Sequence, residues 1–119
     1  MAKLIVSCNH GKEDAERATL PFIVGNVAAS ADQQTAMLLT MDGVWLATKG
    51  YADDIQKEGF PALRDVLQSF VSNGGEIWAC GTCTKPRGIT EADLIEGARI
   101  VTAAFFVDQI VSGASNIAF

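Results

Sequence analysis

Short, almost continuously apolar runs recur along the chain, separated by polar and glycine-containing stretches. Residues 3–8, 35–41 and 76–80 are three such runs. An unbroken apolar run of this length is typical of a strand that is covered on both faces of a sheet. The pattern therefore predicts buried strands over these three ranges.

The clearest helix is predicted to begin at Pro61, because proline suits the first turn of a helix. Five apolar residues then recur at i, i+3, i+4, i+7 and i+8, which places them in one stripe on a helix surface. They are Leu63, Val66, Leu67, Phe70 and Val71. The run Asn73-Gly74-Gly75 is predicted to end this helix.

Another helix is predicted between the first two strands, opening at Glu13 or Asp14 and reaching about Ser30. Acidic residues are favourable at the positive end of a helix. Pro21 conflicts with this assignment, because proline inside a helix removes one hydrogen bond and clashes with the preceding turn. We expect a kink there, or a helix that restarts at Leu20.

The remaining segments are shorter. They are predicted as a short helical segment over 44–47, a loop over 52–60, a helix over 91–98, a strand over 99–101, a helix over 103–111 and a terminal strand over 116–119. Strand and helix thus alternate five times, which predicts a parallel sheet with helices on both faces. No repeat or linker interrupts the pattern, so we expect a single domain over residues 1–119.

The composition of the chain limits the classes of function and the compartments that fit the protein. The net charge is −5 and no cluster of lysine and arginine occurs, which argues against binding to nucleic acid or to an anionic membrane. No apolar run reaches the length of a membrane span, and no signal-peptide core is expected at the N-terminus. Three cysteines, an odd number, indicate free thiols in a reducing compartment, so we expect a cytoplasmic protein. Only 19% of the residues are charged, which favours an oligomer.

Residues 74–91 carry the strongest chemical signal. Cys80 ends the third predicted strand and is followed by a glycine- and proline-containing loop with Lys85 and Arg87. Open α/β folds present functional groups at the carboxyl ends of their strands. A thiolate is favoured near cations or a helix amino terminus, and Thr90 with Asp93 has the capping pattern of such a terminus. Cys80 is a candidate nucleophile, although a buried structural cysteine fits its position equally well.

Cys83 completes a Cys80-x-x-Cys83 spacing, which occurs in dithiol redox sites and as half of a zinc site. A four-ligand zinc site would also need Cys8 and His10, after the first strand. If one strand separates these segments, their backbones are roughly 10 Å apart. We therefore favour a site without metal and interpret Cys8 as a core residue.

Three further kinds of residue follow the predicted strands. His10, the only histidine, could act as a base beside a thiol, but a loop histidine is more often solvated. Asp42 follows the second strand and could hold a ligand, with a capping role preferred. Trp45 and Tyr51 could form an aromatic wall or a subunit contact, and core packing fits Trp45 equally well. Phosphate-binding glycine motifs and the Gly-x-Ser-x-Gly elbow are missing from the sequence.

The order of these motifs resembles the DsrE/DsrF-like family, which includes TusD-like sulfur-relay proteins. The matching features are the apolar first strand, Glu16-Arg17-Ala18, Asp42-Gly43-Val44, Cys80 followed by Arg87-Gly88, and Gly97-Ala98. The resemblance implies a three-layer α/β/α domain with a five-stranded parallel sheet, assembled into trimers or hexamers. It also implies that Cys80 accepts a sulfane sulfur as a persulfide and relays it. Cys83 departs from the relay pattern, in which a small apolar residue stands at this position.

The leading hypothesis is therefore a sulfur carrier or sulfurtransferase-like protein that needs no cofactor. Cys80 is the acceptor, Lys85 and Arg87 favour its thiolate, and Cys83 assists or resolves the product. Sulfur donors and acceptors, whether proteins or small thiols, are the expected partners. A first alternative is a dithiol–disulfide oxidoreductase that works through Cys80 and Cys83. A second is a non-catalytic oligomer that binds a small ligand near Asp42 and Trp45.

Overall fold

Apolar runs form a sheet at the centre of the structure, a computed structural model that describes residues 2–119. The strands are β1 Leu4–Cys8, β2 Thr35–Leu39, β3 Glu76–Cys80, β4 Ala98–Val101 and β5 Ser115–Ala118. The α-helices are α1 Ala15–Ser30, α2 Leu63–Ser72, α3 Gly81–Thr84 and α4 Ala103–Val111. The 3-10 helices are η1 Met41–Ala47, η2 Tyr51–Asp54, η3 Lys85–Arg87 and η4 Glu91–Asp93.

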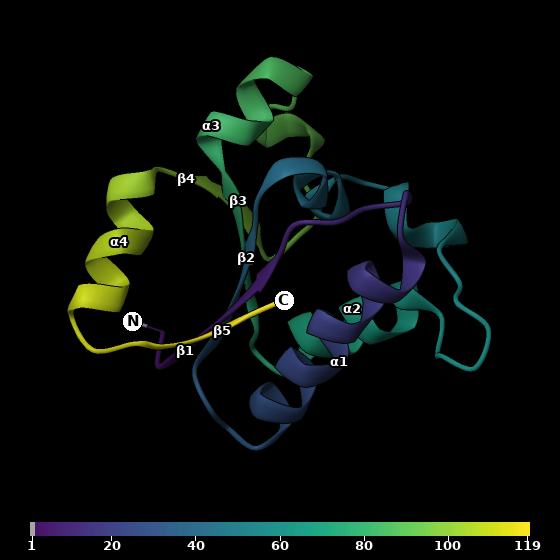
Figure 1. The fold of residues 1–119 in the computed structure, drawn as a ribbon, viewed down its shortest axis with the longest axis horizontal. Helices are drawn as coiled ribbons and strands as arrows, with labels where there is room; N and C mark the ends of the chain where they lie inside the picture. Colours follow the sequence, from purple (N-terminus) through teal and green to yellow (C-terminus); the bar gives the residue numbers. More distant parts are fainter. Residues whose placement is uncertain (1) are drawn as a thin grey trace.

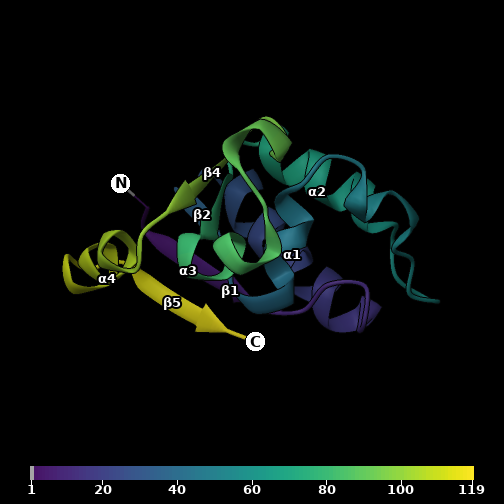
Figure 2. The same ribbon diagram turned by 90° about the horizontal axis from the view of Figure 1, so that it is seen from above.

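All five strands are parallel and lie in the order β4-β3-β2-β1-β5 (Figure 1). The chain moves in one direction across the sheet from β1 to β4, and then returns past β1 to form β5. Because crossovers between parallel strands are right-handed, the first connections and the returning connection cover opposite faces. Helices α1 and α2 accordingly lie on one face and α4 on the other (Figures 1 and 2). The predicted three-layer α/β/α arrangement with a five-stranded parallel sheet is confirmed.

The two faces are covered unequally. A large apolar cluster lies between the sheet and the α1–α2 layer, where Phe22 and Phe70 meet edge to face at a centroid distance of 5.8 Å. The cluster on the α4 side is much smaller and includes Ile5, Leu38 and Trp78. Helix α4 packs Phe105 against Trp78 but contains no fully buried residue. None of the helices within residues 2–119 has the length and apolar character needed to cross a membrane.

Helix α1 runs without interruption through Pro21, so the predicted restart at Leu20 is wrong. Asp14, one of the two acids predicted to open this helix, caps it by accepting a hydrogen bond from the Arg17 backbone N–H at 3.1 Å. Pro21 and Phe22 are both buried. Burial of this face against the sheet offsets the hydrogen bond that proline removes, because tertiary packing supplies most of the stability of a protein helix.

The connection between β3 and β4 differs most from the prediction. Residues 81–87 form α3 and η3 instead of an irregular loop. The predicted helix over 91–98 is wrong, since only the single 3-10 turn η4 forms there. Gly97 prevents a helix from continuing to residue 98: its φ of +88° lies in the left-handed region, and a Cβ at this position would come within 2.9 Å of the Val71 side chain.

Two other boundaries also move. Strand β2 ends at Leu39 rather than 41, because Met41 has a φ of +52° and begins η1, which extends further than the predicted segment over 44–47. Residues 51–54 form η2, where a loop over 52–60 was expected. Both changes replace irregular backbone with short 3-10 helices at the edge of the sheet where the strands end.

Phe70 should be one of the residues on which folding depends. Replacing Phe70 with alanine leaves a cavity between α1 and α2, and we expect the free energy of unfolding to fall by about 3–5 kcal/mol. Val27→Ala on the exposed side of α1 is the control and should change it by less than about 0.5 kcal/mol. Equal effects in urea denaturation would contradict the assignment of the core.

Candidate functional site

Cys80 is the last residue of β3 and the residue directly before α3. Its backbone is extended (φ −64°, ψ 122°), so its side chain follows the alternation of the strand. Trp78, two residues earlier, belongs to the apolar cluster on the α4 side. The Cys80 thiol therefore lies on the α4 side of the sheet, at the carboxyl end of the strand, and the residue is 5% exposed.

Cys8 lies on the other face. It is fully buried in the α1–α2 cluster, as the sequence predicted for a core residue. Its Sγ atom is 3.8 Å from the carbonyl oxygen of Arg17. That carbonyl would normally accept a bond from residue 21, which is proline and has no N–H. Cys8 thus donates to a backbone group that Pro21 leaves free.

Burial raises the pKa of Cys8 to about 11; a hydrogen bond with the His10 backbone acts in the opposite direction, and the Glu13 carboxylate also raises the pKa. At neutral pH this thiol is protonated and is not a nucleophile. Cys8 and Cys80 cannot share a metal ion without rearrangement, because their side chains lie on opposite faces of the sheet. Within residues 2–119 no group of three or more potential metal-ligating side chains occurs.

Cys83 lies in α3 and is half buried against the α1–α2 cluster. Its backbone carbonyl accepts a hydrogen bond from Arg87 Nη1 at 3.0 Å. Cys80 and Cys83 are both free thiols in the structure. The two are close in sequence, but each packs toward a different face of the sheet.

Arg87 and Asp42, two predicted site residues, form an ion pair. Arg87 Nη2 and Nε donate to Asp42 Oδ1 at 2.9 and 3.2 Å. Asp42 therefore connects η1 to the β3–α3 segment, instead of capping η1 as the sequence favoured. The positive charge of Arg87 is balanced by a carboxylate. Lys85 is exposed, and no hydrogen bond or ion pair of its side chain is present in the part of the chain described.

His10 is paired with an acid on its own loop. Its Nδ1 atom lies 2.7 Å from Glu13 Oε2, and the other carboxylate oxygen of Glu13 accepts from the Gly11 backbone N–H at 2.6 Å. No contact joins His10 to Cys80 in the described residues. Trp45 and Tyr51 do form an aromatic pair, stacked with centroids 6.0 Å apart, and Lys12 Nζ lies 4.7 Å from the Tyr51 ring centroid.

Thr90 and Asp93 form the predicted capping interaction, in which Asp93 Oδ2 accepts from the Thr90 backbone N–H at 2.8 Å. It caps only the single turn η4. The expected helix amino terminus, which would have favoured a thiolate at Cys80, is therefore reduced to one turn that carries two acidic residues.

Asn9 is a polar residue at this edge that the sequence did not single out. Its Oδ1 atom is buried and is the one such side-chain atom in residues 2–119 that lacks a hydrogen-bond partner. An unpaired buried polar group costs about 1–3 kcal/mol. The signal in the sequence was its place directly after a buried strand.

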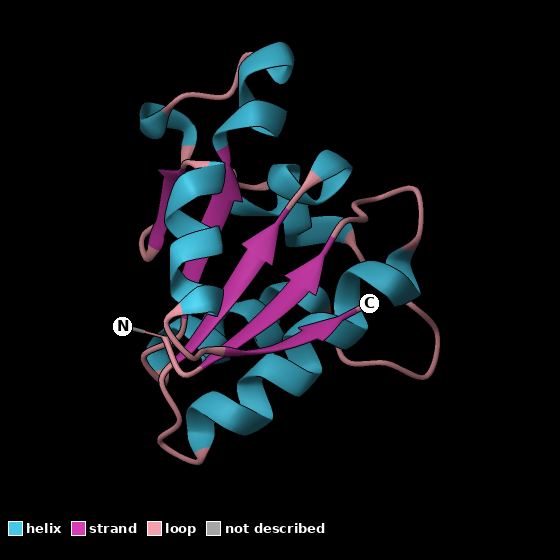
Figure 3. Ribbon diagram, turned by 60° about the vertical axis from the view of Figure 1, so that its left-hand side comes forward, coloured by secondary structure: helices cyan, strands magenta, loops and turns pink. Residues whose placement is uncertain are grey.

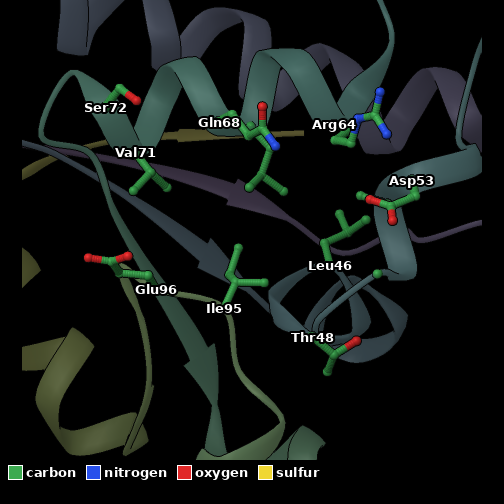
Figure 4. Close-up of a pocket in the computed structure, with 12 residues that line it drawn as sticks. Leu46, Thr48, Asp53, Arg64, Gln68, Val71, Ser72, Ile95 and Glu96 are labelled. Carbon is green, nitrogen blue, oxygen red and sulfur yellow. The ribbon is translucent and has the colours of Figure 1, made fainter.

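The cavities of the structure lie beside the thiols rather than over them. A pocket of about 440 Å³ lies between α2, η2 and residues 95–96, and no cysteine lines it (Figure 4). Arg64 and Asp53 lie at one end of it in this view and Glu96 at the other. A second pocket, of about 390 Å³, is lined by Trp45, Lys49 and Arg87 among others, which is the region where the sequence placed a possible small ligand.

The fold is an all-parallel α/β domain. Its candidate site holds a free thiol, Cys80, at the carboxyl end of β3. The model of the DsrE/DsrF-like family matches residues 2–119, and the chain belongs to this family. The resemblance inferred from the sequence motifs is confirmed.

Relatives and solved structures agree with this assignment. The chain is 32% identical over 104 residues to the uncharacterized protein MK0008 of Methanopyrus kandleri, covering 87% of this chain and 82% of that one. It is 32% identical over 108 residues to the uncharacterized protein MJ0760 of Methanocaldococcus jannaschii, covering 91% of this chain but only 39% of that longer protein. The ychN protein from E. coli has the same fold, with a TM-score of 0.80, 21% identity and full coverage of both chains. MTH1491 from Methanobacterium thermoautotrophicum, a protein of unknown function, gives a TM-score of 0.71 at 18% identity, again with full coverage of both chains.

The raised pKa of Cys8 predicts a loss of stability at alkaline pH. The thiol ionises near pH 9 in the unfolded chain and near pH 11 in the folded protein, so the unfolded state binds fewer protons between these values and stability falls as pH rises. The full effect is about 2.7 kcal/mol at 1.36 kcal/mol per unit of pKa. Urea denaturation at pH 8 and pH 10.5 should show a smaller loss for Cys8→Ala than for wild type. Parallel losses would contradict the assignment.

Proposed function

We propose that the protein is a cytoplasmic sulfur carrier in which Cys80 holds a persulfide and relays it to an acceptor thiol. The observation that carries the proposal is the placement of Cys80: a free thiol at the carboxyl end of β3, separated by the sheet from the inert Cys8. Membership of the DsrE/DsrF-like family, in which sulfur relay is known, supports it.

The chemistry needs only thiols. The Cys80 thiolate attacks the outer sulfur of a donor persulfide, so that a new S–S bond forms at Cys80 and the donor's S–S bond breaks. The donor leaves as a thiolate and takes up a proton. An acceptor thiolate then attacks the outer sulfur on Cys80 and regenerates the Cys80 thiolate. Sulfur moves at its original oxidation level, so no oxidant, reductant or cofactor is consumed.

Low exposure of Cys80 suits this role. A persulfide on a residue that is 5% exposed is shielded from oxidation and from unrelated thiols. Arg87, paired with Asp42, holds the β3–α3 connection against η1 through the Cys83 carbonyl. We assign Lys85, Arg87, His10 and Asp42 to supporting roles at the edge of the sheet where the strands end. In a side route Cys83 is the resolving thiol: its thiolate attacks the inner sulfur of the Cys80 persulfide, hydrosulfide leaves, and the Cys80–Cys83 disulfide that forms is reduced by a low-molecular-weight thiol.

Partners are sulfur donors and acceptors, whether proteins or low-molecular-weight thiols, and other copies of the chain. The α4 side of the domain supports assembly into a homo-oligomer, a trimer or hexamer. Large apolar side chains are exposed along α4, the helix that covers this face of the sheet in Figures 1 and 2. These side chains are Val107, Ile110 and Val111. Burial of such a patch between copies removes apolar surface from water.

Intact-mass spectrometry after exposure to glutathione persulfide tests the carrier function. We expect one sulfur atom to add to wild type and to Cys83→Ser, and none to add to Cys80→Ser. Cys8→Ala should behave as wild type because Cys8 is buried and protonated.

A different result would overturn the proposal. If wild type loses two hydrogens and retains no sulfur, and if Cys83→Ser loses all dithiol–disulfide exchange activity, the protein is a dithiol–disulfide oxidoreductase. If no thiol reacts at neutral pH, the protein is a binding or regulatory oligomer, and the pocket beside Trp45 is the place to look for its ligand.

The molar mass of the protein, measured by light scattering during size-exclusion chromatography, tests the assembly. Val111→Glu places a charge on the exposed apolar side of α4, and we expect it to reduce the molar mass to that of a monomer. Val27→Glu on α1 is the matched control, an exposed valine in the opposite layer, and should leave the mass unchanged. Equal masses for wild type and Val111→Glu would contradict an α4 interface.

A further inference from the structure

Asn9, Thr40 and Cys80 lie in one row across the carboxyl ends of three neighbouring strands. In the sheet Cys8 pairs with Leu39, and Leu39 pairs with Ala79. Asn9, Thr40 and Cys80 each stand one position after these paired residues, and together they form the row. The ladder continues into it, because the Thr40 backbone N–H donates to the Cys8 carbonyl at 3.1 Å.

Thr40 and Cys80 face the same side of the sheet. Both have extended backbone, with φ −129° and ψ 163° at Thr40. Side chains alternate along a strand, and Leu38 and Trp78, two residues earlier, belong to the α4-side cluster. In Figure 3, which looks onto this side, no helix crosses the arrowheads of β1 and β2. The Thr40 hydroxyl and the Cys80 thiol are therefore neighbours on the same face.

The polar groups of this row have no partners of their own. The Asn9 Oδ1 atom is buried without a hydrogen bond. The side chains of Thr40 and Cys80 likewise make no hydrogen bond within residues 2–119. Thr40 is half buried, so its hydroxyl remains free to bond a group that is added beside it on Cys80.

We propose that Thr40 is a sulfur-binding residue of the relay, whose hydroxyl donates a hydrogen bond to the outer sulfur of the Cys80 persulfide. Neighbouring strands are about 4.8 Å apart, and the outer sulfur lies about 2 Å beyond Sγ. The added atom enters the space that separates the thiol from the hydroxyl. This inference rests on the proposed function, because it concerns the sulfur that Cys80 would carry.

The hydrogen bond favours the ionised persulfide. A donor that binds the charged form of an acid lowers its pKa, so Thr40 increases the fraction of Cys80 persulfide present as the anion. It thereby shifts the sulfur-exchange equilibrium toward the loaded protein. Cys80 bears the sulfur, and Thr40 stabilises its charge.

Thr40→Val tests the proposal because valine keeps the shape of threonine and lacks the hydroxyl. Sulfur loading is measured by intact mass at equilibrium with glutathione persulfide and glutathione. The pKa of the persulfide is measured from the pH dependence of its alkylation. We expect Thr40→Val to lower the loading constant roughly 10-fold and to shift the alkylation midpoint upward by about one pH unit. Thr40→Ser, which keeps the hydroxyl, should restore both.

Thr35→Val is the matched control, since Thr35 lies at the other end of β2 and its hydroxyl donates to the Gln33 carbonyl. It should leave loading and midpoint unchanged. If wild type loads and Thr40→Val matches it in both measurements, the role of Thr40 is wrong and the carrier function stands. If wild type does not load at all, the carrier function itself fails.

Discussion

Parallel pairing of the strands is the constraint on which the rest of the molecule depends. Because all five strands run the same way, their carboxyl ends meet at one edge of the sheet. Every connection must therefore return along the length of a strand before the next strand can begin. The polar residues that follow β1, β2 and β3 are thereby collected at one edge, although they are about 30 to 40 residues apart in the sequence. Asp42 and Arg87 meet there across 45 positions of the chain.

Alternation within the strands then separates the cysteines. A shift of one residue along a strand moves a side chain to the opposite face. Cys8 is level with Ala79 and Cys80 lies one residue further, so Cys8 is buried beneath α1 while Cys80 belongs to the other face. This single step explains why one thiol is held protonated in the α1–α2 core and why the other lies on the opposite face, at the end of β3.

The fold followed from the sequence more fully than the site did. Buried strands leave unbroken apolar runs, and α2 leaves a regular stripe, so these elements are visible in the order of residues. The segment after Cys80 was harder, because its course depends on Gly97 at a positive φ and on the contact of that glycine with Val71. The partner of Arg87 and the neighbour of Cys80 depend on strand register. Register is a property of two strands together, so neither Asp42 nor Thr40 could be placed from local pattern alone.

Helix α4 differs from the other long helices in having no buried residue. Little apolar burial means that its docking onto the sheet is weak, and weakly docked elements open locally long before the whole domain unfolds. Its main anchor is Phe105, which contacts both the Trp78 ring and the Arg99 guanidinium. If the exposed side of α4 is covered by another copy of the chain, the local stability of this layer depends on protein concentration. The fluorescence of Trp78 would then report dilution of the protein before any loss of the sheet.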